Sequence, residues 1–263
     1  MDENLKKRLR DNFLSFSGYL RHPKPGIYVL ASHFISSGSY SYGGKAKILE
    51  NFYEHLIKLG DVIGFDEAVN RINSKNTRID KPLIALSFDD GFEECEEIAN
   101  FFTKKKIDVA FFINSNAIEA EKSYYNDHFE RLKVADKKFL TWSALRDMHS
   151  AGHIIGSHTK DHFRLNSPNN EIIMEQIIGD KKLIDTKIVG DCQNFAWPYG
   201  SDNDINEFAI GLASKIFKNV FSSCNHKFYN SSCGRVLNRR HVEPDWKESH
   251  LRFFLSARRS FYK

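Results

Sequence analysis

The sequence predicts an α/β fold with a parallel sheet, on three observations. Apolar segments of strand length alternate with segments of helical periodicity, and seven such strands are expected because this alternation is typical of βα units. The chain has 263 residues and a hydrophobic content of 41%, which is enough for one large domain with a substantial core. Short polar motifs follow directly after several strands, where the functional loops of parallel sheets lie. Both a barrel and a doubly wound sheet fit this pattern.

The first 26 residues are predicted to form a leading helix ahead of the alternating segments. Apolar residues recur there at helical spacing, at Leu5, Leu9, Phe13, Phe16 and Leu20. Lysine and arginine residues between positions 6 and 10 give this helix a basic face. Such a face is suited to peripheral contact with anionic lipid, but a solvated helix face is the favoured interpretation.

The other elements follow in order along the chain. The predicted strands are 27–34, an aspartate-bearing strand within 82–91, 107–113, a histidine-bearing strand that begins at 153, 192–198, 218–223 and 235–243. The predicted helices are 46–59, 66–72, 92–105, 141–151, 167–189, 204–217 and 245–260. Gly60 and Gly152 are expected to end two of these helices, and Pro168 to lie in the first turn of another. The polar segment 114–138 is predicted to be an insertion within a single domain that spans residues 1–263.

Composition and charge argue against several classes of function. A net charge of +4, from 38 basic and 34 acidic residues, comes without a dense basic stripe, so no nucleic-acid partner is expected. The four cysteines have no C-x-x-C spacing, and reduced thiols in a cytosolic protein are the simpler interpretation. Residues 1–12 lack the apolar core of a secretion signal, and no apolar run approaches membrane-spanning length. The sequence therefore predicts a cytoplasmic protein without a transmembrane segment.

Two adjacent carboxylates end one of the predicted apolar strands. The stretch Pro82–Gly91 reads P-L-I-A-L-S-F-D-D-G, so Asp89 and Asp90 lie where the backbone must turn. Crowding two carboxylates at the rim of a sheet costs several kcal/mol unless a cation or strong donors offset the cost. The pair therefore indicates a metal site, a proton-transfer role, or both, although an Asx turn that closes the strand would explain an isolated D-D-G.

Two histidines follow a later strand at a spacing that suits a metal. The segment 153–162 reads H-I-I-G-S-H-T-K-D-H, which places His158 and His162 four residues apart just after the strand. Two neutral imidazoles and one carboxylate form the three-ligand set of an open catalytic zinc site. Alone, the histidine pair would be structural or incidental, but together with the earlier carboxylates it predicts a shared site.

These residues resemble the motifs of the polysaccharide deacetylases with a NodB-like domain, carbohydrate esterase family 4. The segment 87–91 matches the first motif, [ST]-F-D-D-G, and 158–162 matches the second, H-[ST]-x-x-H. The third motif, R-x-P-[YF], is matched by Pro198 and Tyr199, with Ala196 where the family has arginine. The resemblance extends roughly from residue 27 to the C-terminus and implies an irregular (β/α)7 barrel.

The resemblance also implies roles for these residues. Asp90, His158 and His162 would hold one divalent metal ion, for which Zn²⁺ is the expected identity, and Asp89 would be the general base. The turn at Pro198–Tyr199 would contact substrate, with the backbone N–H of Tyr199 helping to hold the oxyanion.

The general acid and the partner of the base are less directly indicated. The family's last motif, L-x-H, is replaced by a strand that reads V-L-N-R-R-H-V-E, in which His241 is the preferred general acid over His226 and His250. Strand alternation puts His241 on the same face as Arg239 and Glu243, and Arg240 on the other.

If the face with Arg240 points inward, that arginine would replace the one missing at Ala196 and would bind near the base or the substrate. Ser32–His33 also corresponds to an aromatic–histidine pair of several relatives and would border the site, although a packed core histidine is the favoured interpretation of His33.

The expected function is hydrolysis of the acetamide of an N-acetylated amino sugar by a metal-dependent deacetylase. The substrate would be a glycan or a glycan precursor, in the biosynthesis of cell-surface polysaccharide. Two alternatives remain: hydrolysis of a non-sugar amide on the same scaffold, and a non-catalytic carbohydrate-binding protein. Intact Asp89 and the three ligand residues argue against the binding protein, while Ala196 and the altered last motif argue for it.

Overall fold

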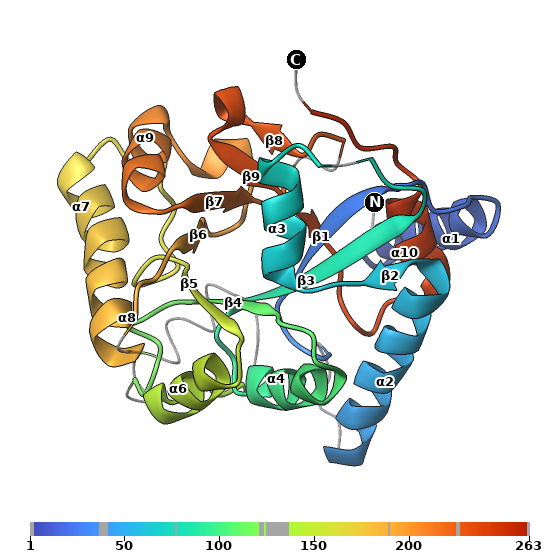
Figure 1. The fold of residues 1–263 in the computed structure, drawn as a ribbon, viewed down its shortest axis with the longest axis horizontal. Coiled ribbons are helices and arrows are strands. Elements are labelled where there is room, and N and C mark those ends of the chain that lie inside the picture. The colour runs from blue at the N-terminus through green and yellow to red at the C-terminus, as the bar shows by residue number, and fades with distance from the viewer. Residues whose placement is uncertain are drawn as a thin grey trace.

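Parallel strands form a curled sheet of the (β/α)7 barrel type (Figure 1). The computed structural model describes residues 3–36, 42–76, 78–120, 124, 137–188, 190–224 and 227–261. In chain order the strands of the barrel are β1 (Gly26–Ser32), β3 (Pro82–Asp90), β4 (Ala110–Ile113), β5 (Ile154–Ser157), β6 (Asn194–Ala196), β7 (Asn219–Ser222) and β9 (Val236–Asn238) with its continuation β10 (Arg240–His241). This confirms the fold expected from the sequence.

The last strand closes the barrel. β9 pairs in parallel with β7, whereas β10, which follows after a single residue, pairs in parallel with β1. The residue between the two halves is Arg239. Two short strands lie outside this ring: β2 (Asp61–Val62) pairs with β3, and β8 (Asn230–Ser231) runs antiparallel to β9.

Helices surround the sheet, as expected from the alternating pattern (Figure 1). They are α2 (Tyr42–Leu59), α3 (Phe65–Asn73), α4 (Glu94–Lys105), α6 (Trp142–Ser150), α7 (Asn170–Met174), η1 (Glu175–Gly179), α8 (Asp180–Ile188), α9 (Glu207–Ile216) and α10 (Glu248–Leu255). Except in α3, their apolar faces and the outward residues of the strands form the larger of the hydrophobic clusters. The predicted insertion 114–138 lies for the most part outside the described residues.

The interior of the barrel is closed at one end by α3. Phe65 of this helix contacts the rings of Phe112 and Phe221, with centroids 6.2 and 5.4 Å apart. The same cluster includes Ile27 of β1 and Leu83 of β3, near the beginnings of their strands. Because the strands are parallel, their C-terminal ends all lie at the opposite end of the barrel. Functional residues of such barrels gather at that end.

The leading helix α1 (Glu3–Tyr19) lies outside the ring, against α10 (Figure 1). It packs through Leu14 and Gly18, and a Cβ at Gly18 would lie 1.7 Å from the carbonyl oxygen of Ser249. The apolar residues predicted from helical spacing are exposed, although the ring of Phe13 reaches that of Phe253 on α10. Among the described residues, no helix is long and apolar enough to cross a membrane.

Candidate active site

β3 delivers the two carboxylates to the open end of the barrel. Leu83 and Ala85 face the interior, so Asp89, which has the same parity, faces it as well. Asp90 has a φ of 75°, a conformation that non-glycine residues rarely adopt, and Gly91 follows with a φ of 77°. The chain thus turns sharply at Asp90, and backbone strain of this kind is concentrated at functional sites.

The turn after β5 brings the two histidines together. Thr159 and His162 both have positive φ angles, of 65° and 52°. The Thr159 hydroxyl accepts a hydrogen bond from the Phe163 N–H at 2.9 Å, and the Asn114 amide donates to the carbonyl of His158 at 2.6 Å. The tightened turn places the ring of His162 5.3 Å from that of His158, centroid to centroid.

The three expected ligands converge on one point. The Nε2 atoms of His158 and His162 lie 3.5 and 3.3 Å from Oδ1 of Asp90. Ligand atoms about 2.1 Å from a tetrahedral ion would be about 3.4 Å apart. Among the described residues, this buried Oδ1 accepts no hydrogen bond. Since an orphaned buried carboxylate oxygen is costly, the donor set fits a divalent cation.

Protonation of the ligands is consistent with metal binding. Nδ1 of His158 lies 2.7 Å from the carbonyl oxygen of Ala196, which can only accept, so Nδ1 holds the proton and Nε2 keeps its lone pair. Burial lowers the pKa of His158 to about 4, so its imidazole is neutral. Burial raises the pKa of Asp90 to about 7, with Asp89 and Glu243 adding to the rise and His33 opposing it.

Asp89 is held as an anion by a buried arginine. Arg239 donates from its two terminal nitrogens to the two oxygens of Asp89, each at 2.8 Å, and also to the Ser87 hydroxyl at 2.9 Å. Burial acts to raise the pKa of Asp89, but the Arg239 charge and hydrogen bonds outweigh it and hold this pKa below its usual value. Asp89 is therefore ionised and fixed in orientation.

The arginine at this position is Arg239, not Arg240, so the expectation that Arg240 replaces the arginine missing at Ala196 is wrong. Leu237 belongs to the interior cluster, and residues of the same parity, including Arg239, point inward. Arg240 points outward, where its guanidinium lies 3.9 Å from the ring centroid of Phe254 on α10.

A second cluster of titratable residues lies beside the first, across the β1–β10 pair. Oε1 of Glu243 lies 2.7 Å from Nδ1 of His33 and 2.8 Å from Nε2 of His241. The two imidazole rings are 5.2 Å apart, centroid to centroid. Three such side chains are also a possible metal-ligand set. The short contacts to a single carboxylate oxygen, however, are those of charge-assisted hydrogen bonds.

His33 is the histidine of this cluster that faces the carboxylates. Burial lowers its pKa, but Glu243, Asp90 and Asp89 outweigh burial and raise it to about 10. The favoured interpretation of His33 as a packed core residue is wrong, because its side chain is half-buried and ion-paired. Its partner Glu243 is 210 positions away, so no local pattern in the sequence indicates this pair.

Of the other candidate acids, His250 lies away from this site. His250 lies between α10 and α1, with Nε2 3.1 Å from the Ser15 hydroxyl. His226 falls outside the described residues. His241 is at the site, but its side chain is the more exposed of the two imidazoles bound to Glu243.

The Pro198–Tyr199 turn follows β6 and lies next to His162. Tyr199 has a φ of 64° and its ring centroid lies 4.6 Å from that of His162. Gly200 follows with a φ of 70°, and a Cβ there would lie 2.5 Å from Cβ of Ser223. The guanidinium of Arg164 covers the Tyr199 ring at 3.6 Å. The turn is therefore fixed next to a metal ligand, with Pro198 buried beneath it.

One supporting residue was not singled out from the sequence. Asp180, at the start of α8, is fully buried and accepts hydrogen bonds from the Ser157 hydroxyl at 2.5 Å and the Ser115 N–H at 3.2 Å. Burial raises its pKa to about 6. It anchors the end of β5 immediately before His158.

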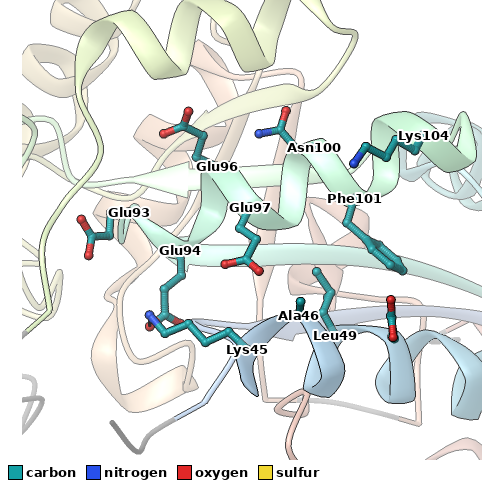
Figure 2. A pocket seen from close by; sticks show the side chains of 11 residues that line it. Lys45, Ala46, Leu49, Glu93, Glu94, Glu96, Glu97, Asn100, Phe101 and Lys104 are labelled. Atoms are coloured by element: carbon teal, nitrogen blue, oxygen red, sulfur yellow. Dashed lines mark ion pairs between the residues drawn. The ribbon is translucent and has the colours of Figure 1, made fainter. Parts of the chain in front are cut away.

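A cavity of about 900 Å³ lies between α2 and α4, and it does not include the metal ligands (Figure 2). Glutamates dominate its wall, but Glu94 is neutralised by Lys45 at 2.8 Å and by Lys137 at 2.6 Å. Figure 2 shows Lys45 extending from α2 toward Glu94. The Lys45–Glu94 ion pair is therefore a structural link between α2 and α4.

Comparison with known sequences gives one family. The sequence model described as polysaccharide deacetylase matches residues 76–212, which include both carboxylates, both histidines and the Pro198–Tyr199 turn. No curated protein matches the chain significantly.

Solved structures show the same fold at low identity. IcaB from Ammonifex degensii superposes with a TM-score of 0.68 at 18% identity, over 90% of this chain and 100% of that chain. The deacetylase PplD from Streptococcus pyogenes gives 0.63 at 15% identity, over 87% and 97%. A de-N-acetylase from Aggregatibacter actinomycetemcomitans gives 0.63 at 19% identity, over 87% and 99%.

Proposed function

The chain belongs to the polysaccharide deacetylase family, and on this premise we propose that it is a metal-dependent N-deacetylase. Its substrate would be an N-acetylated amino sugar in a glycan or glycan precursor of cell-surface polysaccharide biosynthesis. The proposal rests on one observation above all. The orphaned Oδ1 of Asp90 lies 3.5 and 3.3 Å from two imidazole nitrogens, beside an Asp89 that an arginine keeps ionised.

Amide hydrolysis needs an activated nucleophile next to a polarised carbonyl. A divalent cation held by Asp90, His158 and His162, with Zn²⁺ as the expected ion, would polarise the acetamide carbonyl and make the attacking water more acidic. Asp89 would accept the proton of that water, because it is ionised and each of its oxygens keeps a lone pair that Arg239 does not use.

The leaving amine needs a proton, and His33 is better placed to supply it than His241. Its Nδ1 is bound to Glu243, which leaves Nε2 for the substrate, and the charges of Asp89 and Asp90 act on it directly. At neutral pH its imidazole is protonated. His241 would then hold Glu243 in place from the other side.

The developing oxyanion would meet the backbone at Tyr199. The left-handed conformation of this residue is the support for that role, since positive φ angles re-orient a backbone N–H. The Tyr199 ring, packed between His162 and Arg164, would fix the turn.

The alternative of a non-catalytic binding protein loses its main argument. Ala196 counted for it because the family arginine is missing there, but Arg239 now orients the base.

The free thiols of the four cysteines support the proposal of a cytosolic, reducing location.

Acetate release is the direct test. The purified protein should release acetate from N-acetylglucosamine oligomers or acetylated nucleotide sugars, a chelator should stop the release, and added Zn²⁺ should restore it. Free N-acetylated amino acids, which offer the same amide without a sugar, are the matched control. Full metal occupancy without acetate from any amino sugar would contradict the proposal.

A further inference from the structure

Helix α1 and Leu20, which follows it, expose an unusual row of large apolar side chains. Leu5, Leu9, Phe13, Phe16 and Leu20, here called the apolar stripe, have exposures of 47% to 69%. Tyr19 beside them is 80% exposed. An amphipathic surface helix normally buries such a stripe against the core, so this helix is the reverse of the usual arrangement.

The stripe is narrow and directly opposite the face that packs on the protein. At about 100° per residue, the five side chains fall within an arc of about 80°. Leu14 and Gly18, on the opposite side of the helix, make the contact with α10. Gly18, which has no side chain, lets α1 approach α10 closely, and this contact fixes the stripe toward the outside.

The stripe continues onto the neighbouring helix. The ring of Phe13 meets that of Phe253 on α10, edge to face, with centroids 6.0 Å apart. The guanidinium of Arg21 covers Phe253 at 4.6 Å. Contiguous exposed apolar surface edged by charge marks a site of interaction with a protein or a membrane.

Basic residues flank the stripe on both sides. Arg8 and Arg10 adjoin Leu9 in sequence, so they project about 100° to either side of it, and both are exposed. Asp11, to which Arg10 is ion-paired at 3.2 Å, lies toward α10 rather than toward the stripe. Arg21 and Lys24, which follow the helix in sequence, are exposed as well.

We propose that α1 lies flat on an anionic lipid surface, with the apolar stripe in the acyl boundary and the arginines at the headgroups. Aromatic and leucine side chains on one face with basic residues at its edges are the features of interfacial helices. Long arginine side chains can bury their stems while keeping the charge at the headgroup level. A second copy of the chain is a poorer occupant, because its stripe would bring Arg8 and Arg10 against arginines of the same sign.

Vesicle binding by the whole protein tests this. The probe is a vesicle of equal parts phosphatidylglycerol and phosphatidylcholine, compared with one of phosphatidylcholine alone, in a sedimentation assay. We expect binding to the anionic vesicle that weakens with added salt. Replacing Leu9, Phe13 and Phe16 by glutamine, which keeps helix propensity, should weaken it at least a hundredfold. Arg8→Gln with Arg10→Gln should weaken it roughly 30-fold.

The control removes three exposed apolar side chains elsewhere on the surface. Ile57→Gln, Ile172→Gln and Phe208→Gln together alter α2, α7 and α9, and should leave vesicle binding within twofold of the original protein. No binding to the anionic vesicle, or unchanged binding by the α1 variant, would overturn the proposal. A dimer in sedimentation that the α1 variant abolishes, without vesicle binding, would also overturn it and identify a second copy as the occupant.

Discussion

Arg239 donates one hydrogen bond to each carboxylate oxygen of Asp89, both at 2.8 Å, from a side chain that is completely buried. The two residues are 150 positions apart. A planar guanidinium that grips a carboxylate at both oxygens fixes its plane as well as its charge. The arrangement holds Asp89 as an anion next to Asp90 and leaves on each of its oxygens a lone pair that Arg239 does not use.

Substitution of Arg239 should therefore damage both stability and catalysis. Arg239→Gln leaves the Asp89 charge buried without its partner, and removing one member of a buried ion pair costs about 3–5 kcal/mol. It should also raise the pKa of Asp89, so the acid limb of the rate profile moves to higher pH. Urea unfolding and the pH dependence of kcat/KM measure the two effects.

Arg240→Gln is the control for this prediction, because it removes a guanidinium one residue away that stacks on Phe254. It should cost about 1 kcal/mol of stability and leave the acid limb in place. An acid limb that moves in the Arg240 variant and not in the Arg239 variant would reverse the assignment.

Asp89→Asn should separate catalysis from metal binding. The amide cannot accept the proton of water, so kcat should fall by about 10²- to 10⁴-fold. Asp89 is not among the side chains that converge on the metal position, so bound metal per chain, measured by elemental analysis, should not change. Loss of the metal together with activity would show that Asp89 is a ligand.

The affinity of the site for zinc should depend on pH. Because the pKa of Asp90 is raised to about 7, a proton competes with the ion below that pH, while His158, with a pKa of about 4, stays neutral. Zinc affinity should fall about tenfold for each unit of pH below 7, with one proton released on binding. Calorimetry in two buffers measures both quantities.

Two alanine variants test the same ligand set by metal content. His158→Ala or His162→Ala should remove the ion. His149→Ala, an exposed histidine on α6, should keep it. Stoichiometric metal in either of the first two variants would refute the ligand assignment.

Local patterns predicted much of this molecule, because they concern residues that are close in sequence. The strand that ends in Asp89 and Asp90 and the turn between His158 and His162 are encoded within ten residues each. Their meeting follows from parallel strands, whose C-terminal ends share one edge. Features that depend on residues far apart in the sequence were harder to predict. The face on which Arg239 lies depends on how the interrupted last strand joins β7 and β1.

The same limit explains the two other differences. His33 meets Glu243 because β1 and β10 are neighbours in register, with Ala31 opposite His241, and no local pattern gives that pairing. The periodicity of α1 identified its apolar stripe, but not which way the stripe faces, since that depends on the contact of Gly18 with Ser249. Periodicity shows which residues share one face of the helix, but tertiary packing decides whether that face points to the protein or to the solvent.

The cluster of His33, His241 and Glu243 makes the last prediction, in which the roles of the two histidines differ. His33→Ala should reduce kcat by about 10²- to 10⁴-fold, as for loss of a general acid, whereas His241→Ala should reduce it less than tenfold. Glu243→Gln should lower the pKa of His33 from about 10, so the alkaline limb of kcat/KM moves to lower pH.

The same pair should also make the free energy of unfolding depend on pH. Since the folded pKa of His33 lies above its usual value, its pairing with Glu243 stabilises the fold fully below that usual value and is lost as the pH rises toward 10. The stability difference between the original protein and Glu243→Gln, measured by urea unfolding, should therefore shrink between pH 7 and pH 10. A severe loss of kcat in His241→Ala with normal turnover in His33→Ala would instead make His241 the acid, as the sequence alone predicted.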